Sequence, residues 1–179
     1  MSSETPDLRK KVEDSRGLLK KIQLIVPGFR GYRQLEDLRA ADEMLRRQVV
    51  QLLQNTETLV KEARSNMVNS GDYSNLQPVA SFLSKLQLLE GEIMHAEQGY
   101  SGISPAIRVS QQTLDSLYNY DYAFVASASE LKVNAESSGI ASLSGDGLNS
   151  ELSRLSAMAD EIMSSLQKRM EAVAKIKVV

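Results

Sequence analysis

The chain has 179 residues, a formal net charge of -2 and no cysteine. This length suits a single domain with a continuous core. The balanced charge provides no overall attraction to nucleic acid or to anionic lipid, and the lack of cysteine excludes disulfides, thiolate metal sites and cysteine nucleophiles. The charged N-terminus and the lack of a long apolar run predict a cytoplasmic protein without a membrane span.

The composition favours helices over strands. Aromatic residues make up only 5% of the chain, and Leu, Ala, Ser, Glu, Lys, Arg and Gln dominate. Residues 118–124 alternate aromatic and other side chains as a strand would, but the apolar residues around them follow helical spacing. A helix is therefore predicted there as well.

The first predicted helix covers residues 6–26, because Thr5 suits the N-cap, Pro6 suits the first turn, and Pro27 with Gly28 ends it. The second covers residues 33–68. Along it, leucines recur every seven residues, as in the seam of a coiled coil, at Leu38, Leu45, Leu52 and Leu59.

Three more helices are predicted at residues 75–98, 105–136 and 148–177. The segment 69–75 is a turn by composition, GYSGI at 99–103 breaks the pattern, and the serine-rich segment 137–147 is expected to be a flexible connection. Lys168 and Arg169, near the end of the last helix, suit the helix dipole.

These elements predict an all-α fold, an antiparallel helical bundle or coiled-coil hairpin of about five helices in one domain, 1–179. Short connections would make successive helices antiparallel. The glycine-rich and aromatic loops PGFRGYR at 27–33 and GYSGISP at 99–105 would then meet at one end of the bundle. A third and fourth helix that formed one kinked helix would instead separate the two loops.

Two interpretations of the loop end stay open. In the structural one, the glycines and aromatics end the first helix and close the core. In the functional one, arginines and backbone amides bind a phosphate or another anion. Together with the tyrosines of the segment YNYDYAF, the candidate binding residues are Arg30, Tyr32, Arg33, Tyr100, Arg108, Tyr118 and Tyr120.

Two acids, Asp42 and Asp121, occupy helix positions where an apolar residue would stabilise a bundle more. A buried acid needs a partner, so each is predicted to be a structural residue that binds a tyrosine or an arginine of a facing helix. Measured from the expected end of the bundle, they lie roughly 15 Å and 24 Å down. Different partners are therefore expected, and a catalytic pair is not.

No metal site, cofactor or catalytic residue is predicted. Glu92 and His95 match the Glu-x-x-His pattern of ferritin-like di-iron bundles, but that site needs a second histidine and the chain has only one. Neither a phosphate-binding loop nor a nucleophile elbow is present. Methionines at helical spacing are read as core residues rather than as an interaction face, at Met158, Met163 and Met170.

Three stretches together resemble a family of small prokaryotic helical proteins of uncharacterised function: PGFRGYRQLEDLRAADEMLRRQ at 27–48, GYSGI at 99–103 and LYNYDYAFV at 117–125. The resemblance covers roughly residues 18–131 and includes both Asp42 and Asp121. It implies a helical fold and no activity, and the serine-rich C-terminal third departs from the pattern.

The function predicted from the sequence is that of a non-enzymatic helical scaffold or adaptor for an unknown protein partner. Spare apolar surface also allows a homodimer, and no nucleic-acid partner is expected. One alternative is a peripheral membrane protein that uses the first helix, in which Lys10, Lys11, Lys20 and Lys21 flank an apolar stripe. Another is binding of an anionic ligand at the PGFRGY and GYSG end.

Overall fold

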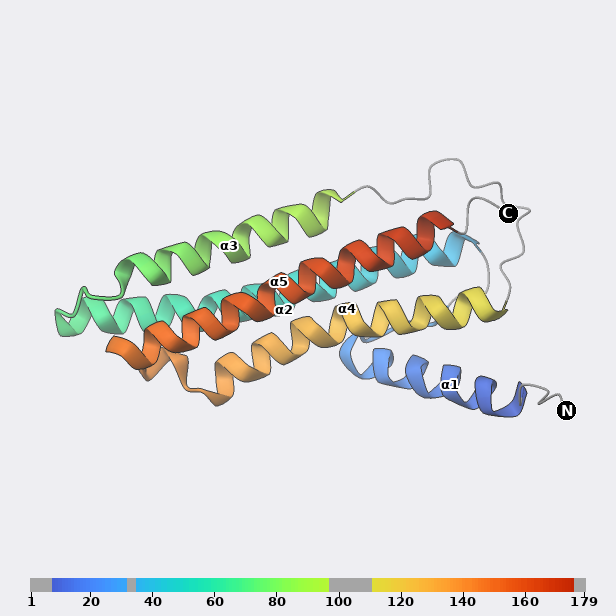
Figure 1. Ribbon diagram of the computed structural model, residues 1–179, viewed down its shortest axis with the longest axis horizontal. Helices are drawn as coiled ribbons and strands as arrows, with labels where there is room; N and C mark the ends of the chain where they lie inside the picture. Colours follow the sequence, from blue (N-terminus) through green and yellow to red (C-terminus); the bar gives the residue numbers. More distant parts are fainter. Residues whose placement is uncertain (1–7, 32–34, 97–110, 176–179) are drawn as a thin grey trace, which may run out of the picture.

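The structure is a computed structural model that describes residues 8–31, 35–96 and 111–175. The described residues form an all-α helical bundle, which confirms the predicted fold class (Figure 1). The helix ends with described residues on both sides lie within three residues of the predicted ones. The elements are α1 (Leu8–Ile25), α2 (Leu35–Ser70), α3 (Leu76–His95), α4 (Gln111–Ser137), the 3-10 helix η1 (Ile140–Ser142) and α5 (Gly145–Lys175).

Four of the helices form a closed ring. α2 packs against α3 and α4, and α5 packs against the same two helices. α3 and α4 therefore lie at opposite corners, and they run in opposite directions (Figure 1). The interior is one continuous apolar cluster that includes Val49, Leu86, Phe124 and Leu155, each fully buried. No helix within the described ranges is long and apolar enough to cross a bilayer.

α1 lies outside this ring and packs against α4. It runs in the same direction as α2, whereas short connections predict that the two are antiparallel (Figure 1). That prediction is wrong because the connection, residues 26–34, is long enough to double back. Nine extended residues span about 30 Å, close to the roughly 27 Å length of α1. The turn at Pro27 and Gly28 therefore lies against the side of the bundle and not at its end.

The segment 26–31 is packed between α1 and the ring. Val26 and Phe29 are 2% and 1% exposed. The Gln23 side-chain amide donates a 2.8 Å hydrogen bond to the Phe29 carbonyl, which holds the turn against α1. Gly31 has a φ of 79°, and a Cβ there would lie 2.6 Å from the Tyr118 hydroxyl. Glycine is thus required both by the backbone conformation and by the close approach of α4.

Gly31→Ala is expected to lower the free energy of unfolding by at least about 1 to 2 kcal/mol, the cost of a left-handed conformation for a residue with a Cβ. The contact with the Tyr118 hydroxyl adds to this cost. Urea denaturation measures the change. The matched control is Gly17→Ala, at a helical position of α1 whose Cβ would meet nothing within 4 Å, and it should stabilise the protein slightly. Equal effects of the two substitutions would contradict the close approach.

The connection between α4 and α5 is more ordered than the predicted flexible segment. Ile140 of η1 is fully buried, and η1 packs against α2. Side-chain amides bind the connection at two points: Asn66 donates a 2.8 Å hydrogen bond to the Ala141 carbonyl, and Asn75 donates a 2.6 Å hydrogen bond to the Gly145 carbonyl. The serines predict flexibility, but one buried isoleucine and two distant asparagines fix the segment.

Candidate functional site

A cluster of four charged side chains lies in the interior of the ring. Asp42 and Arg46 come from α2, Asp121 from α4 and Arg169 from α5, and their exposed fractions are 1%, 4%, 0% and 2%. Arg169 joins the two acids: its Nε donates a 2.7 Å hydrogen bond to Asp121, and its Nη1 donates to Asp42. Charges at this depth are stable only when they are matched in this way.

Arg46 extends the cluster to the fourth helix of the ring. Its Nε donates a 2.7 Å hydrogen bond to the second oxygen of Asp42. Its Nη1 donates to the carbonyls of Ile93 and Ala96, at 2.7 and 2.8 Å. Ile93 lies in the last turn of α3 and Ala96 is its C-cap, where a helix leaves carbonyls without partners and its dipole favours a cation. Arg46 therefore caps α3 while it neutralises Asp42.

Asp42 and Asp121 are predicted to have different partners, and this prediction is wrong because one arginine binds both. The prediction measured the depth of each acid from an assumed common starting level of the two helices. Hydrophobic spacing shows which face of a helix is buried, but it does not show how far one helix is shifted along its axis relative to its neighbour. That shift brings the two acids to one level.

The sequence predicts only a dipole interaction for Arg169, whereas the structure shows that it binds both aspartates. A signal was present, because Ala159, Ile162, Leu166 and Val173 continue a buried stripe at three- and four-residue spacing and Arg169 occupies the position between the last two. A charged residue inside such a stripe predicts a buried partner of opposite charge. The two aspartates are these partners.

The tyrosines of YNYDYAF are buried or half-buried. Tyr118 is 8% exposed and faces Gly31, Tyr120 is half-buried, and the Lys21 ammonium lies 5.5 Å from the centre of the half-buried Tyr122 ring. This distance allows a cation–π contact. The surface that the aromatic pattern predicts is thus largely used within the chain.

The predicted loop site is described only in part. Arg30 is exposed. The other loop candidates, Tyr32, Arg33, Tyr100 and Arg108, lie outside the described residues, and so does the predicted meeting of Tyr32 with Tyr100. The structure instead brings residues 26–31 next to Tyr118.

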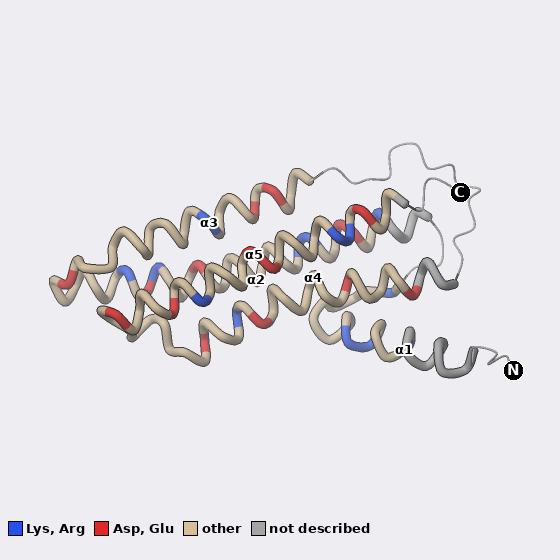
Figure 2. Tube along the Cα trace, viewed as in Figure 1, with Lys and Arg blue, Asp and Glu red and all other residues tan. Residues whose placement is uncertain are grey.

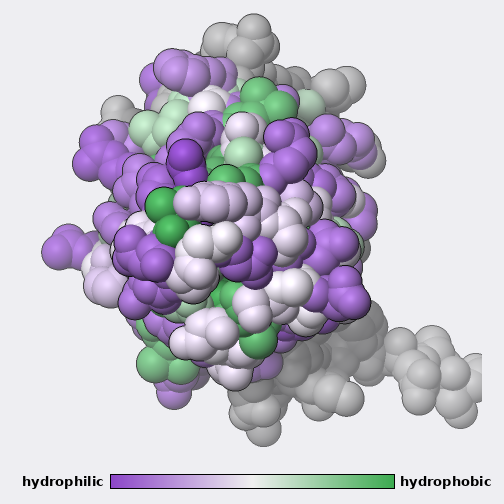
Figure 3. All heavy atoms as spheres, turned by 90° about the vertical axis from the view of Figure 1, so that its left-hand side faces the viewer, coloured by the Kyte–Doolittle hydropathy of each residue, from purple (hydrophilic) through white to green (hydrophobic). Residues whose placement is uncertain are grey.

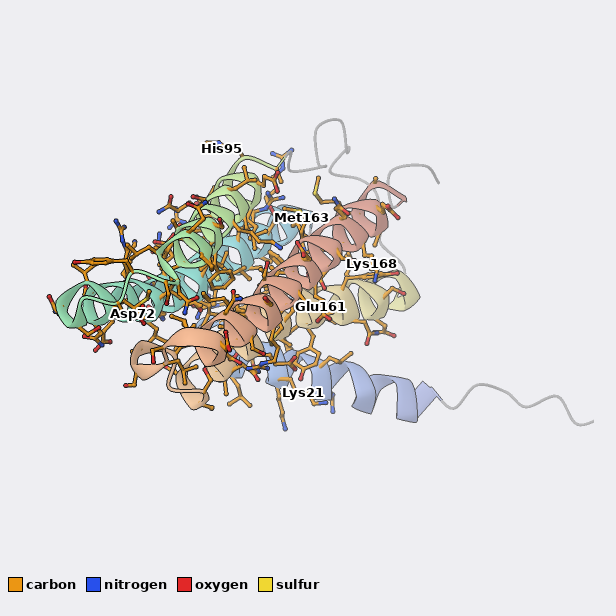
Figure 4. The ribbon with its side chains drawn as sticks, turned by 60° about the vertical axis from the view of Figure 1, so that its left-hand side comes forward. Lys21, Asp72, His95, Glu161, Met163 and Lys168 are labelled. Atoms are coloured by element: carbon orange, nitrogen blue, oxygen red, sulfur yellow. The ribbon has the colours of Figure 1, made fainter. Side chains whose placement is uncertain are left out.

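Among the described residues, His95 belongs to no metal site and the methionines of α5 contact the core. His95 lies at the exposed end of α3, and its side chain points away from the other helices (Figure 4). The described residues contain no group of three or more His, Cys, Asp or Glu side chains placed to hold a metal ion. The methionines of α5 pack against the core from partly buried positions, at Met158, Met163 and Met170.

A charge-poor surface on α3 was not predicted. We call it the α3 outer face, and its exposed residues are Gln77, Ala80, Ser81, Ser84, Gln87, Leu88, Glu92, Met94 and His95. Among them, Glu92 is the one Asp, Glu, Lys or Arg, whereas α2 and α5 carry charges along their length (Figure 2). Leu88 and Met94 are 64% and 51% exposed. The low charge of residues 76–95 is the sequence signal that would have revealed this face.

The end of the bundle at the α2–α3 turn presents a different surface. There, hydrophobic residues form small separate patches among hydrophilic ones (Figure 3). Tyr73, in the turn, is 62% exposed. Isolated exposed apolar residues of this kind are normal on protein surfaces. The α3 outer face is therefore a more distinctive surface than this end of the bundle.

Fold and site together define a helical bundle with a charge cluster at its centre and a charge-poor outer helix. No protein-family model, curated protein or solved structure matches the chain. The resemblance drawn from the short motifs above therefore stays a prediction.

Proposed function

We propose that this chain is a non-enzymatic helical scaffold or adaptor that binds a partner protein through the α3 outer face. The observation that carries the proposal is the near absence of charge from the exposed residues of α3, combined with the exposed Leu88 and Met94. Depletion of charged residues is the compositional mark of an interface core.

The spacing of the face indicates the kind of partner. Ala80, Ser84 and Leu88 of this face follow one another at intervals of four residues, and the half-buried Gly91 comes three residues later. A Cβ at Gly91 would meet nothing within 4 Å, so the surface is open there. Small side chains around one leucine let another helix approach closely, and the three- and four-residue spacing suits an amphipathic helix. The proposed partner element is such a helix.

The buried charge cluster supports a scaffold role, because it ties all four helices of the ring at one level. A rigid support reduces the conformational entropy that is lost on binding. The membrane alternative has less support. Ile22 of α1 and Val26, which follows the helix, are buried, and α1 packs against α4, so bilayer binding by α1 would require it to leave the bundle.

The test is site-specific photo-cross-linking in cells that produce the protein. A cross-linking residue in place of Leu88 is expected to capture one discrete protein. The matched control is Glu161, an exposed acid on α5 (Figure 4). Leu88→Lys is expected to abolish co-purification of the captured protein without changing the melting temperature, because Leu88 is 64% exposed. Equal capture from Leu88 and Glu161 would contradict the proposal, and capture of the same chain would identify a homodimer.

A further inference from the structure

Two carboxyl groups meet at the interface between α2 and α3. Glu57 of α2 is 5% exposed, and Glu90 of α3 is half-buried. Gln54 lies one turn before Glu57 on α2 and donates a hydrogen bond to Glu90, which places the two carboxyls next to each other across this interface. Two ionised carboxylates in this position would repel each other.

The remaining contacts leave one oxygen of each carboxyl without a donor. The Lys61 ammonium binds Oε2 of Glu57, and the Gln54 side-chain amide donates a 3.4 Å hydrogen bond to Oε2 of Glu90. Oε1 of Glu57 and Oε1 of Glu90 are both buried, and neither receives a hydrogen bond from the described residues. Ionised carboxylates only accept hydrogen bonds, so the two Oε1 atoms bind each other only if one of them carries a proton.

We propose that Glu57 and Glu90 hold one proton between their Oε1 atoms, and that this shared proton fastens α3 to α2. One carboxyl then donates and the other accepts. The pair as a whole carries a single negative charge, which the Lys61 ammonium balances. The proton comes from solvent and returns to it, and no covalent bond other than O–H is made or broken.

The surrounding charges agree with this assignment. Burial, followed by the negative charge of Glu57, raises the pKa of Glu90, and Gln54 and Lys61 oppose the rise. Toward α5, Lys85 of α3 and Asp160 of α5 pair with each other at 2.7 Å. A divalent cation fits less well than a proton, because two carboxylates and one amide provide few of the six to eight oxygens that Ca²⁺ takes. The Lys61 ammonium also already binds Glu57.

The proton couples stability to pH with a definite sign. The folded state holds the proton more tightly than the unfolded state, in which Glu90 titrates near its ordinary pKa of 4.5. The contribution to stability is therefore fully present below that value, and it is lost as the pH rises through the higher pKa of the folded state.

The experiment compares melting temperatures between pH 4.5 and pH 9 for the wild-type chain, Glu90→Gln and Glu92→Gln. The wild-type melting temperature is expected to fall with rising pH by a few degrees relative to Glu90→Gln, because the glutamine amide is a permanent donor. Glu92 is exposed on the same helix, so Glu92→Gln should follow the wild type. Parallel curves for the wild type and Glu90→Gln would overturn the proposal.

Two further measurements on the wild-type chain test the proposal even if Glu90→Gln folds poorly. Carbon NMR of the wild-type chain should show a Glu90 carboxyl that titrates above the other glutamates, and a Glu90 that titrates with them would overturn the proposal. Addition of Ca²⁺ or Mg²⁺ at pH 8 should leave the wild-type melting temperature unchanged. A rise in the wild type that is absent from Glu90→Gln would replace the shared proton with a metal ion.

Discussion

Arg169→Met is expected to lower the free energy of unfolding by about 3 to 5 kcal/mol, because it leaves two buried aspartates without their shared cation. Arg169 binds Asp121 of α4 and Asp42 of α2 from a position that is only 2% exposed. Methionine has a similar length and is apolar, so the loss comes from the unbalanced charges rather than from a cavity. Urea denaturation followed by circular dichroism measures the change.

The neighbour of Arg169 provides the control. Lys168 is exposed, and Lys168→Met should stay close to the wild type. Asp121→Leu combined with Arg169→Met should recover part of the loss, because it removes one orphaned acid while Arg46 still neutralises Asp42. If Arg169→Met were as stable as Lys168→Met, the cluster would have no role in holding the ring together.

Phe29→Ala is expected to lower the free energy of unfolding by about 3 to 5 kcal/mol, the usual cost of removing a buried phenylalanine side chain. Phe29 is 1% exposed and closes the turn that holds α1 in place. Because α1 lies outside the ring and packs on α4, its amides should lose protection first. Urea denaturation gives the total loss, and hydrogen exchange shows where protection is lost.

Leu24→Ala is the matched control for Phe29→Ala. Leu24 lies on the same helix but is 85% exposed, so the substitution should have little effect on stability. Uniform loss of protection across all five helices in Phe29→Ala would show that α1 is not a separately opening unit.

The helices were predictable from the sequence because each buries a face that recurs at helical spacing. The seam of α2 illustrates this, since Leu45 and Leu52 at seven-residue spacing are both buried. Pro27 and Gly28 likewise mark the end of α1 to within three residues. The all-α bundle follows from such local rules.

The placement of the helices relative to one another was not predictable in the same way. The direction of α1 depends on whether residues 26–34 turn sharply or double back, and both paths are compatible with their composition. The common partner of Asp42 and Asp121 depends on the axial shift between two helices. The α3 outer face is hard to predict, because aromatic and charged residues indicate candidate sites in a sequence, whereas this surface is defined by a shortage of charge.

The central charge cluster also affects how the stability of the protein depends on temperature. The free-energy penalty for removing charged groups from water falls as temperature rises, since their hydration is entropically unfavourable. Four matched charges in the interior therefore oppose folding less in a warm cell than in a cold one. A version of this bundle with an all-apolar centre should gain most over the natural chain at low temperature, and this advantage should shrink on warming.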